Sequence, residues 1–147
     1  MNRTVYRIAA ALVAATILFA SCDLLGGLGE EALNPTQRVN SFITEVSGTQ
    51  DIAEIKKQFH PLSNTFQVID EAWWDTTLFD ATYQPFTFGP LSGEAEVSAG
   101  VVITTTFTST VRSGALTTFV LAEDPIVVDN WRIMSIDVDG ETINSVR

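Results

Sequence analysis

The feature that most limits how this chain folds is a long stretch of alternating residues between Glu94 and Phe107. Small or apolar side chains occupy every second position from Ala95 to Phe107, and mostly polar residues lie between them. A period of two places one set of side chains on one face of a β-strand, and a half-buried strand needs both neighbouring strands and a covering layer. We therefore expect one long strand, bent near Gly100, within an antiparallel sheet.

The residues that follow supply the neighbouring strands. A turn at residues 112–114 precedes a strand at 115–122, which Asp124-Pro125 ends. Residues 126–128 and 131–138 predict a hairpin joined by Asp129-Asn130. Asp139-Gly140 is typical of a tight hairpin turn, which leaves residues 141–146 as a short last strand.

Two helices are predicted in the first half of the chain. Asn34 is the expected N-cap of the first, with Gln37 at the capping-box position, and Gly48 ends it. The apolar residues of this helix recur at the spacing of one helical face: Val39, Phe42, Ile43 and Val46. Thr49 is the expected cap of a second helix, which ends at His60-Pro61 because proline disfavours the helical region for the residue before it.

Helices followed by strands indicate an α+β fold in which N-terminal helices pack on one face of a curved antiparallel sheet. The helix pair ending in Phe59-His60-Pro61, together with Asn130-Trp131-Arg132-Ile133, resembles the nuclear transport factor 2-like superfamily of cone-shaped, SnoaL-type proteins. The resemblance covers most of residues 34–143, and we assign residues 34–147 to a single domain. The alternative is a small β-sandwich or barrel with N-terminal helices.

The first 22 residues have the layout of an export signal. Arg3 and Arg7 precede an uncharged, mostly apolar run over residues 8–20, which is shorter than the roughly 20 residues of a transmembrane helix. Leu18-Phe19-Ala20-Ser21-Cys22 resembles the lipobox of bacterial lipoproteins. That resemblance implies a signal peptide at 1–21, a lipid such as palmitate on Cys22, and a flexible tether at 22–33. The alternative is an ordinary signal peptide in which Cys22 is incidental.

The acidic composition narrows the range of partners. The chain carries 18 Asp and Glu against 8 Lys and Arg, for a net charge of -10. Such a surface repels nucleic acid. Cys22 is the only cysteine, so the folded body has no internal disulfide. The expected localisation is a bacterial membrane, inner or outer, reached through the N-terminal lipid.

Aromatic residues crowd the middle of the chain, where residues 66–69 predict either a short strand or a helix. The rings that would fill or rim a cavity in the resembled fold, and so bind a ligand, are Trp73, Trp74, Phe79 and Phe86. The favoured interpretation is that they form core. Enzymes of the resembled superfamily use Asp, His or Tyr for proton transfer, which makes His60, Asp70 and Tyr83 the candidate catalytic residues.

Three functions remain open from the sequence. The first is an envelope lipoprotein whose body binds an apolar small ligand or an envelope protein without catalysis. The second is an isomerase or dehydratase with an acid or base in a cavity. The third is a structural protein that oligomerises through its sheet, for example as a homodimer. Since His60 is the only histidine, sites with several histidines are excluded, and we expect no metal and no cofactor.

Overall fold

The computed structural model of the chain describes residues 31–80, 83–98 and 100–143. The chain divides into two units, Met1–Glu31 and Ala32–Arg147, of which the second is described here. The predicted signal peptide, Cys22 and nearly all of the predicted tether lie outside the described residues, so these assignments stay predictions.

Within the described residues, four helices precede the sheet: α2 (Pro35–Ser47), α3 (Ile52–Lys57), α4 (Asn64–Val68) and α5 (Glu71–Trp74). The predicted start of α2 is confirmed, because the Asn34 side chain accepts from the Gln37 N–H and the Gln37 side chain accepts from the Asn34 N–H. Gly48 follows its last residue, as expected. The open choice for residues 66–69 is decided in favour of a helix, since α4 covers most of them.

The predicted boundaries of the second helix were wrong at both ends. Asp51, not Thr49, caps α3 by accepting from the N–H groups of Ala53 and Glu54. The Thr49 hydroxyl instead donates to Glu45 on α2. Helix α3 stops before His60 because the residues that follow the helix bond to the sheet instead. The His60 N–H donates to the Ile133 carbonyl on β5 at 2.8 Å.

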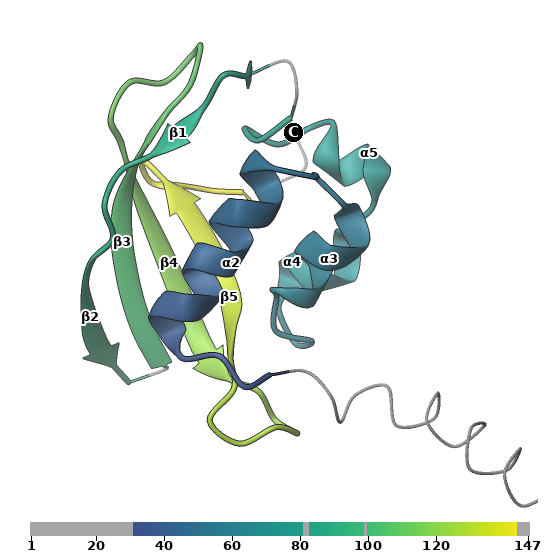
Figure 1. Cartoon of the computed structure of the whole chain (residues 1–147), viewed down its shortest axis with the longest axis vertical. Coiled ribbons are helices and arrows are strands. Elements are labelled where there is room, and N and C mark those ends of the chain that lie inside the picture. The colour runs from purple at the N-terminus through teal and green to yellow at the C-terminus, as the bar shows by residue number, and fades with distance from the viewer. Residues whose placement is uncertain (1–30, 81–82, 99, 144–147) are drawn as a thin grey trace, which may run out of the picture. The chain divides into compact units, whose positions relative to one another are not determined.

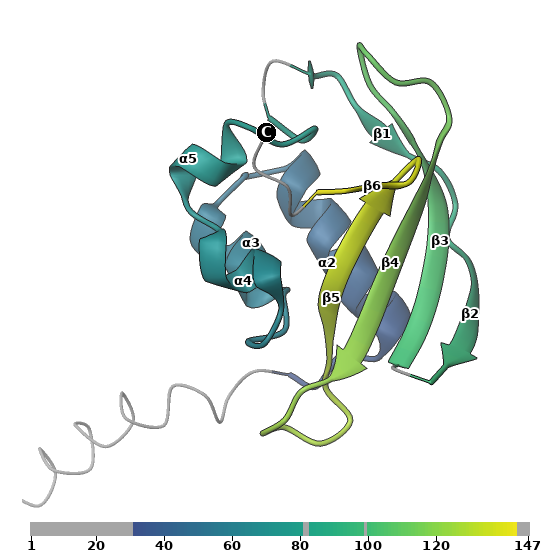
Figure 2. The ribbon, with the colours of Figure 1, turned by 180° about the vertical axis from the view of Figure 1, so that it is seen from behind.

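One antiparallel sheet of six strands follows the helices (Figures 1 and 2). Its strands are β1 (Thr87–Phe88), β2 (Ser92–Val97), β3 (Gly100–Thr108), β4 (Ala115–Glu123), β5 (Trp131–Val138) and β6 (Glu141–Thr142). The order is β1-β3-β4-β5-β6, and β2 pairs with the remaining length of β3. The α+β class is confirmed. The alternative of a sandwich or barrel was wrong, since the described strands form a single sheet that does not close.

The single long strand predicted across Gly100 was wrong, because the chain reverses there. Val97 pairs with Gly100 and Ala95 with Val102, so β2 and β3 form a hairpin. Gly100 has a φ of +143°, and a Cβ at this position would lie 1.8 Å from the Leu121 carbonyl oxygen. Only glycine permits this combination of backbone angle and close approach. The alternation of apolar and polar residues continues through this reversal, so the sequence pattern did not reveal it.

The hairpin prediction near the C-terminus was partly wrong. Residues 126–128 form no strand, and the hairpin joins β4 to β5 through the loop at residues 124–130. The tight turn at Asp139-Gly140 is confirmed, with φ of 53° and 84°, as a type I′ turn requires. Strand β6 is shorter than predicted, and residues 144–146 lie outside the described part of the chain.

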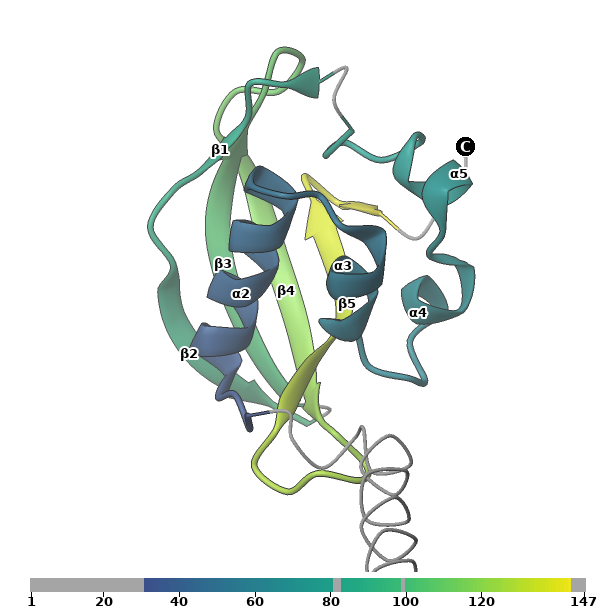
Figure 3. The same ribbon diagram turned by 45° about the vertical axis from the view of Figure 1, so that its right-hand side comes forward.

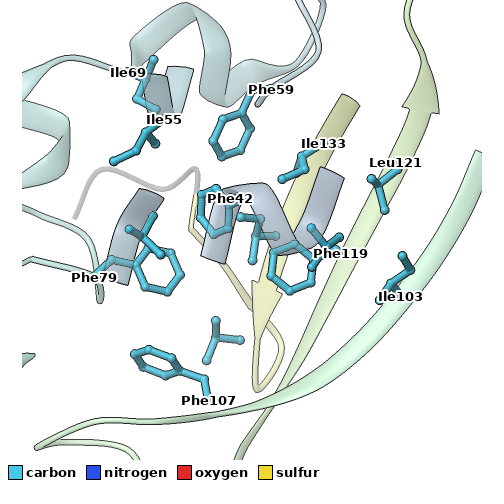
Figure 4. Close-up of a cluster of buried hydrophobic side chains, with 14 of the residues drawn as sticks. Phe42, Ile55, Phe59, Ile69, Phe79, Ile103, Phe107, Phe119, Leu121 and Ile133 are labelled. Carbon is cyan, nitrogen blue, oxygen red and sulfur yellow. The ribbon is translucent and has the colours of Figure 1, made fainter. Parts of the chain in front are cut away.

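The core lies between α2 and the inner face of the sheet. Helix α2 contacts both β3 and β5 and lies across the sheet, while α3 and α4 lie beside β5 (Figure 3). Phe42 on α2 points toward Phe119 on β4 and toward Phe59 and Phe79 (Figure 4). The space between the helices and the inner face of the sheet is therefore filled by core side chains.

Candidate functional site

The aromatic residues considered as ligand-binding candidates lie in or against the core. Trp73, Trp74 and Phe79 are 3%, 7% and 0% exposed, and Phe86 is half-buried. The Phe79 ring lies next to five other rings, whose centroids are 5.4–6.4 Å from its own: Phe42, Trp74, Phe86, Phe88 and Phe107. These distances are those of packed aromatic pairs. None of the four lines either of the two hollows described below.

The three catalytic candidates occupy separate local structures. His60 is buried, and its Nδ1 accepts from the Leu62 N–H at 3.1 Å. Asp70 caps α5 by accepting from the Trp73 N–H at 2.8 Å. Tyr83 lines a small hollow of about 60 Å³ between the α5 segment and β6, together with Thr77 and Glu141. Neither His60 nor Asp70 lines that hollow, so the structure does not bring the three together there.

The larger hollow is an open groove of about 590 Å³ between the start of α2 and strands β2, β3 and β5. We call it the tether-end groove because the chain from the predicted tether enters the domain beside it. Its lining residues are Pro35, Glu94, Glu96, Val97, Gly100, Val101 and Trp131. Its size is within the range of about 300–1,000 Å³ that is usual for ligand sites.

Two carboxylates and an indole give the tether-end groove its chemistry. Glu96 pairs in register with the inward-facing Val101, which places its side chain on the inner face of the sheet. Glu94 accepts a hydrogen bond of 2.6 Å from the Thr36 hydroxyl on α2. Trp131 begins β5 and is half-buried. Carboxylates beside an indole favour a cation, through charge attraction and through the face of the ring.

Trp131 is held in place by Arg38, a residue that sequence reasoning missed. The Arg38 guanidinium is 1% exposed and donates to the Trp131 carbonyl at 2.6 Å, to Gln58 Oε1 at 2.9 Å and to Asn130 Oδ1 at 2.7 Å. It thereby joins α2 to the segment after α3 and to the start of β5. A signal for this role existed: Arg38 lies three residues after Pro35 and four before Phe42, on the buried face of α2.

An ion pair between Arg132 and Asp124 orders the loop at residues 124–130. Asp124 is 9% exposed, and its carboxylate accepts from Arg132 Nε at 2.5 Å and from the N–H groups of Ile126 and Val127. Burial alone would raise the pKa of Asp124. The hydrogen bonds from Arg132 and from the two backbone N–H groups outweigh burial and lower the pKa below 3.8.

We expect Asp124→Asn to lower the free energy of unfolding at pH 7 by about 1–3 kcal/mol, because Arg132 loses a charged partner. A carboxyl whose pKa is lower in the folded state stabilises the fold above its unfolded pKa of 3.8 and loses that effect as pH falls through the folded value. The difference from wild type should therefore shrink below about pH 4. Urea unfolding between pH 3 and pH 7 measures it. Asp129→Asn, at an exposed position of the same loop, is the control and should change little.

Comparison of the chain with family models, with curated proteins and with solved structures finds no match. Among residues 31–80, 83–98 and 100–143, no group of His, Cys, Asp and Glu is arranged to hold a metal ion. Within the same residues, no helix has the length and apolar character needed to cross a membrane. The function of the tether-end groove is therefore inferred from its own residues.

Proposed function

We propose that this protein is a lipid-anchored protein of the bacterial envelope whose folded body binds a basic segment of a partner protein without catalysis. The observation that carries the binding role is the tether-end groove, which combines adequate volume with Glu94, Glu96 and Trp131. The body's fold is proposed to be nuclear transport factor 2-like. The order of helices before an antiparallel sheet, with α2 across one face, supports that assignment.

The proposed anchor is supported by the sequence at the N-terminus. The lipobox-like residues end at Cys22, and the described domain begins about ten residues later, at Ala32. Leu33 is bonded to the body, since its carbonyl accepts from the Trp131 N–H at 2.9 Å. An acylated Cys22 would then hold the body close to a bilayer.

Binding is favoured over catalysis by what lines the groove. Its two carboxylates have no histidine, cysteine, serine or tyrosine beside them among the lining residues. A carboxylate that acts as a general acid is typically enclosed in an apolar pocket, whereas both Glu94 and Glu96 are exposed to solvent. The close contacts among the aromatic rings likewise give less support to an apolar small ligand.

The anchor is tested by the mass of the full chain purified from bacterial membranes. We expect a chain that begins at Cys22 and carries the added mass of its acyl groups. Cys22→Ser should be released from the membrane fraction. A chain that still begins at Met1, or one cut without added lipid, would contradict the anchor.

The groove is tested by titrating the protein with a short lysine-rich peptide and following binding by calorimetry. We expect saturable binding that is weakened at least about tenfold in the double variant Glu94→Gln and Glu96→Gln, which corresponds to about 1.4 kcal/mol. The matched control is Glu71→Gln with Asp75→Asn, which removes the same charge from exposed positions at α5. Equal weakening in both double variants would show that net charge alone attracts the peptide, and would contradict a site in the groove.

A further inference from the structure

The loop at residues 124–130, between β4 and β5, presents two apolar side chains to solvent. Ile126 is 83% exposed and Val128 is 77% exposed, the two highest values for large apolar residues in the described part of the chain. Pro125 beside them is also exposed. Two such side chains at a loop tip contribute nothing to the core and are available for contact with another apolar phase.

This β4–β5 loop holds its two apolar side chains outward by a set of internal hydrogen bonds. Asp124 accepts from the N–H groups of Ile126 and Val127, and its own N–H donates to the Asn130 carbonyl at 2.7 Å. The Asp129 N–H donates to Glu123 Oε1 at 3.0 Å. Hydrogen bonds therefore fix both ends of the loop, and Ile126 and Val128 at its tip stay exposed.

The same loop is bonded directly to the point where the chain enters the domain. The Leu33 N–H donates to Asn130 Oδ1 at 3.1 Å, and the Leu33 carbonyl accepts from Trp131. Figures 1 and 2 show the β4–β5 loop beside the first coloured residues of the chain, at the opposite end of the sheet from the β3–β4 loop. Leu33 is eleven positions after Cys22, and a flexible chain of that length, as predicted for the tether, spans about 18 Å.

We propose that the β4–β5 loop inserts Ile126 and Val128 into the surface of the bilayer that holds the lipid on Cys22. The insertion rests on the proposed anchor. A tether of this length keeps the loop at an effective concentration in the mM range next to the lipid surface. A contact through two apolar side chains, too weak to recruit a free protein, is then sufficient to orient a tethered one.

The charges around the loop define the lipid surface that fits it. Asp124 is paired with Arg132, whereas Glu123 and Asp129 are exposed and carry negative charge. Attraction to anionic lipid therefore does not drive the contact, and zwitterionic lipid is the better surface. Insertion at this loop would also fix the tether-end groove close to the membrane, because Trp131 follows the loop directly.

The test uses the lipidated full chain with Val128→Cys, labelled with a polarity-sensitive fluorophore and reconstituted into phosphatidylcholine vesicles. Acylation blocks the Cys22 thiol, so the introduced cysteine is the one that reacts. The matched control is Val111→Cys, which is 58% exposed in the β3–β4 loop at the other end of the sheet. We expect a blue shift at position 128 and loss of its emission when spin-labelled lipids are included, with neither change at position 111.

A second variant and a thiol assay separate the possible failures. Ile126→Asn in the Val128→Cys background should reduce the blue shift, and its high exposure means that the circular dichroism spectrum should stay unchanged. Normal acylation with equal quenching at positions 128 and 111 would overturn the insertion and leave the anchor intact. A wild-type chain from membranes whose Cys22 reacts with the thiol reagent would overturn the anchor, and the insertion with it.

Discussion

Replacing Arg38 with methionine is expected to lower the free energy of unfolding by about 3–5 kcal/mol. The side chain is 1% exposed, and its guanidinium donates to Trp131, Gln58 and Asn130. Methionine fills part of the volume but donates no hydrogen bond, so three acceptors lose a charged donor inside the fold. Asn130 is fully buried, so water cannot easily replace Arg38 as a hydrogen-bond donor to its side-chain oxygen.

Urea unfolding of the Arg38→Met variant measures this effect. Arg112→Met is the control: Arg112 pairs with Glu141 at 2.8 Å, but both side chains are partly exposed, and such pairs contribute about 0–1 kcal/mol. Arg38→Lys should fall between wild type and methionine, because an ammonium group keeps the charge but cannot reach acceptors on three segments at once. If Arg38→Met were as stable as Arg112→Met, the junction between α2 and β5 would not depend on this residue.

Phe79→Ala is the second substitution with a large expected effect, a loss of about 3–5 kcal/mol in the free energy of unfolding. Phe79 is 0% exposed, and its ring contacts others from α2, α5, β1 and β3, including Phe42 and Phe107. Removing the ring deletes these contacts and leaves a void that the surrounding helices and strands cannot fully close.

The same substitution decides between a packed core and a ligand cavity around the aromatic residues. In a packed core, Phe79→Ala destabilises strongly, and Phe79→Leu destabilises less because leucine retains more of the buried volume than alanine does. In a preformed cavity, Phe79→Ala would change stability little. Thermal unfolding of both variants distinguishes the two cases, with Leu116→Ala, at an exposed position on β4, as the control for a substitution outside the core.

Local signals predicted several elements correctly because the deciding interactions are local. The capping box of Asn34 and Gln37 and the apolar spacing of Val39 and Phe42 require only the first turns of α2 itself. The type I′ turn at Asp139-Gly140 depends on two residues that tolerate positive φ. Strands β4 and β5 were likewise predicted within a residue of their bounds.

Two of the errors occurred where residues distant in the sequence form contacts that no local pattern shows. Helix α3 ends early because His60 pairs with Ile133, which is far away in the sequence. The reversal at Gly100 depends on the approach of Leu121 from β4. An alternating pattern reports which side chains face the core, but it contains no information on where the strand turns back.

The candidate site was the least predictable part. His60, Asp70 and Tyr83 were chosen by residue type, and the structure places each in a separate local arrangement. The tether-end groove instead joins Pro35, Glu94 and Trp131, which come from the start of α2 and from two different strands. No window of the sequence contains all three, so only chain topology brings them together.

By itself, the sequence determined the acidic charge, the export-signal pattern ending at Cys22, and the order of helices before strands, since each is a property of composition or of neighbouring residues. Only the tertiary structure decided that Arg38 is buried, that the aromatic rings pack against one another, and that Leu33 is bonded to the loop carrying Ile126 and Val128. Those features arise from contacts between residues that are distant in the sequence. The contribution of each contact to stability depends on how deeply it is buried, which no local pattern specifies.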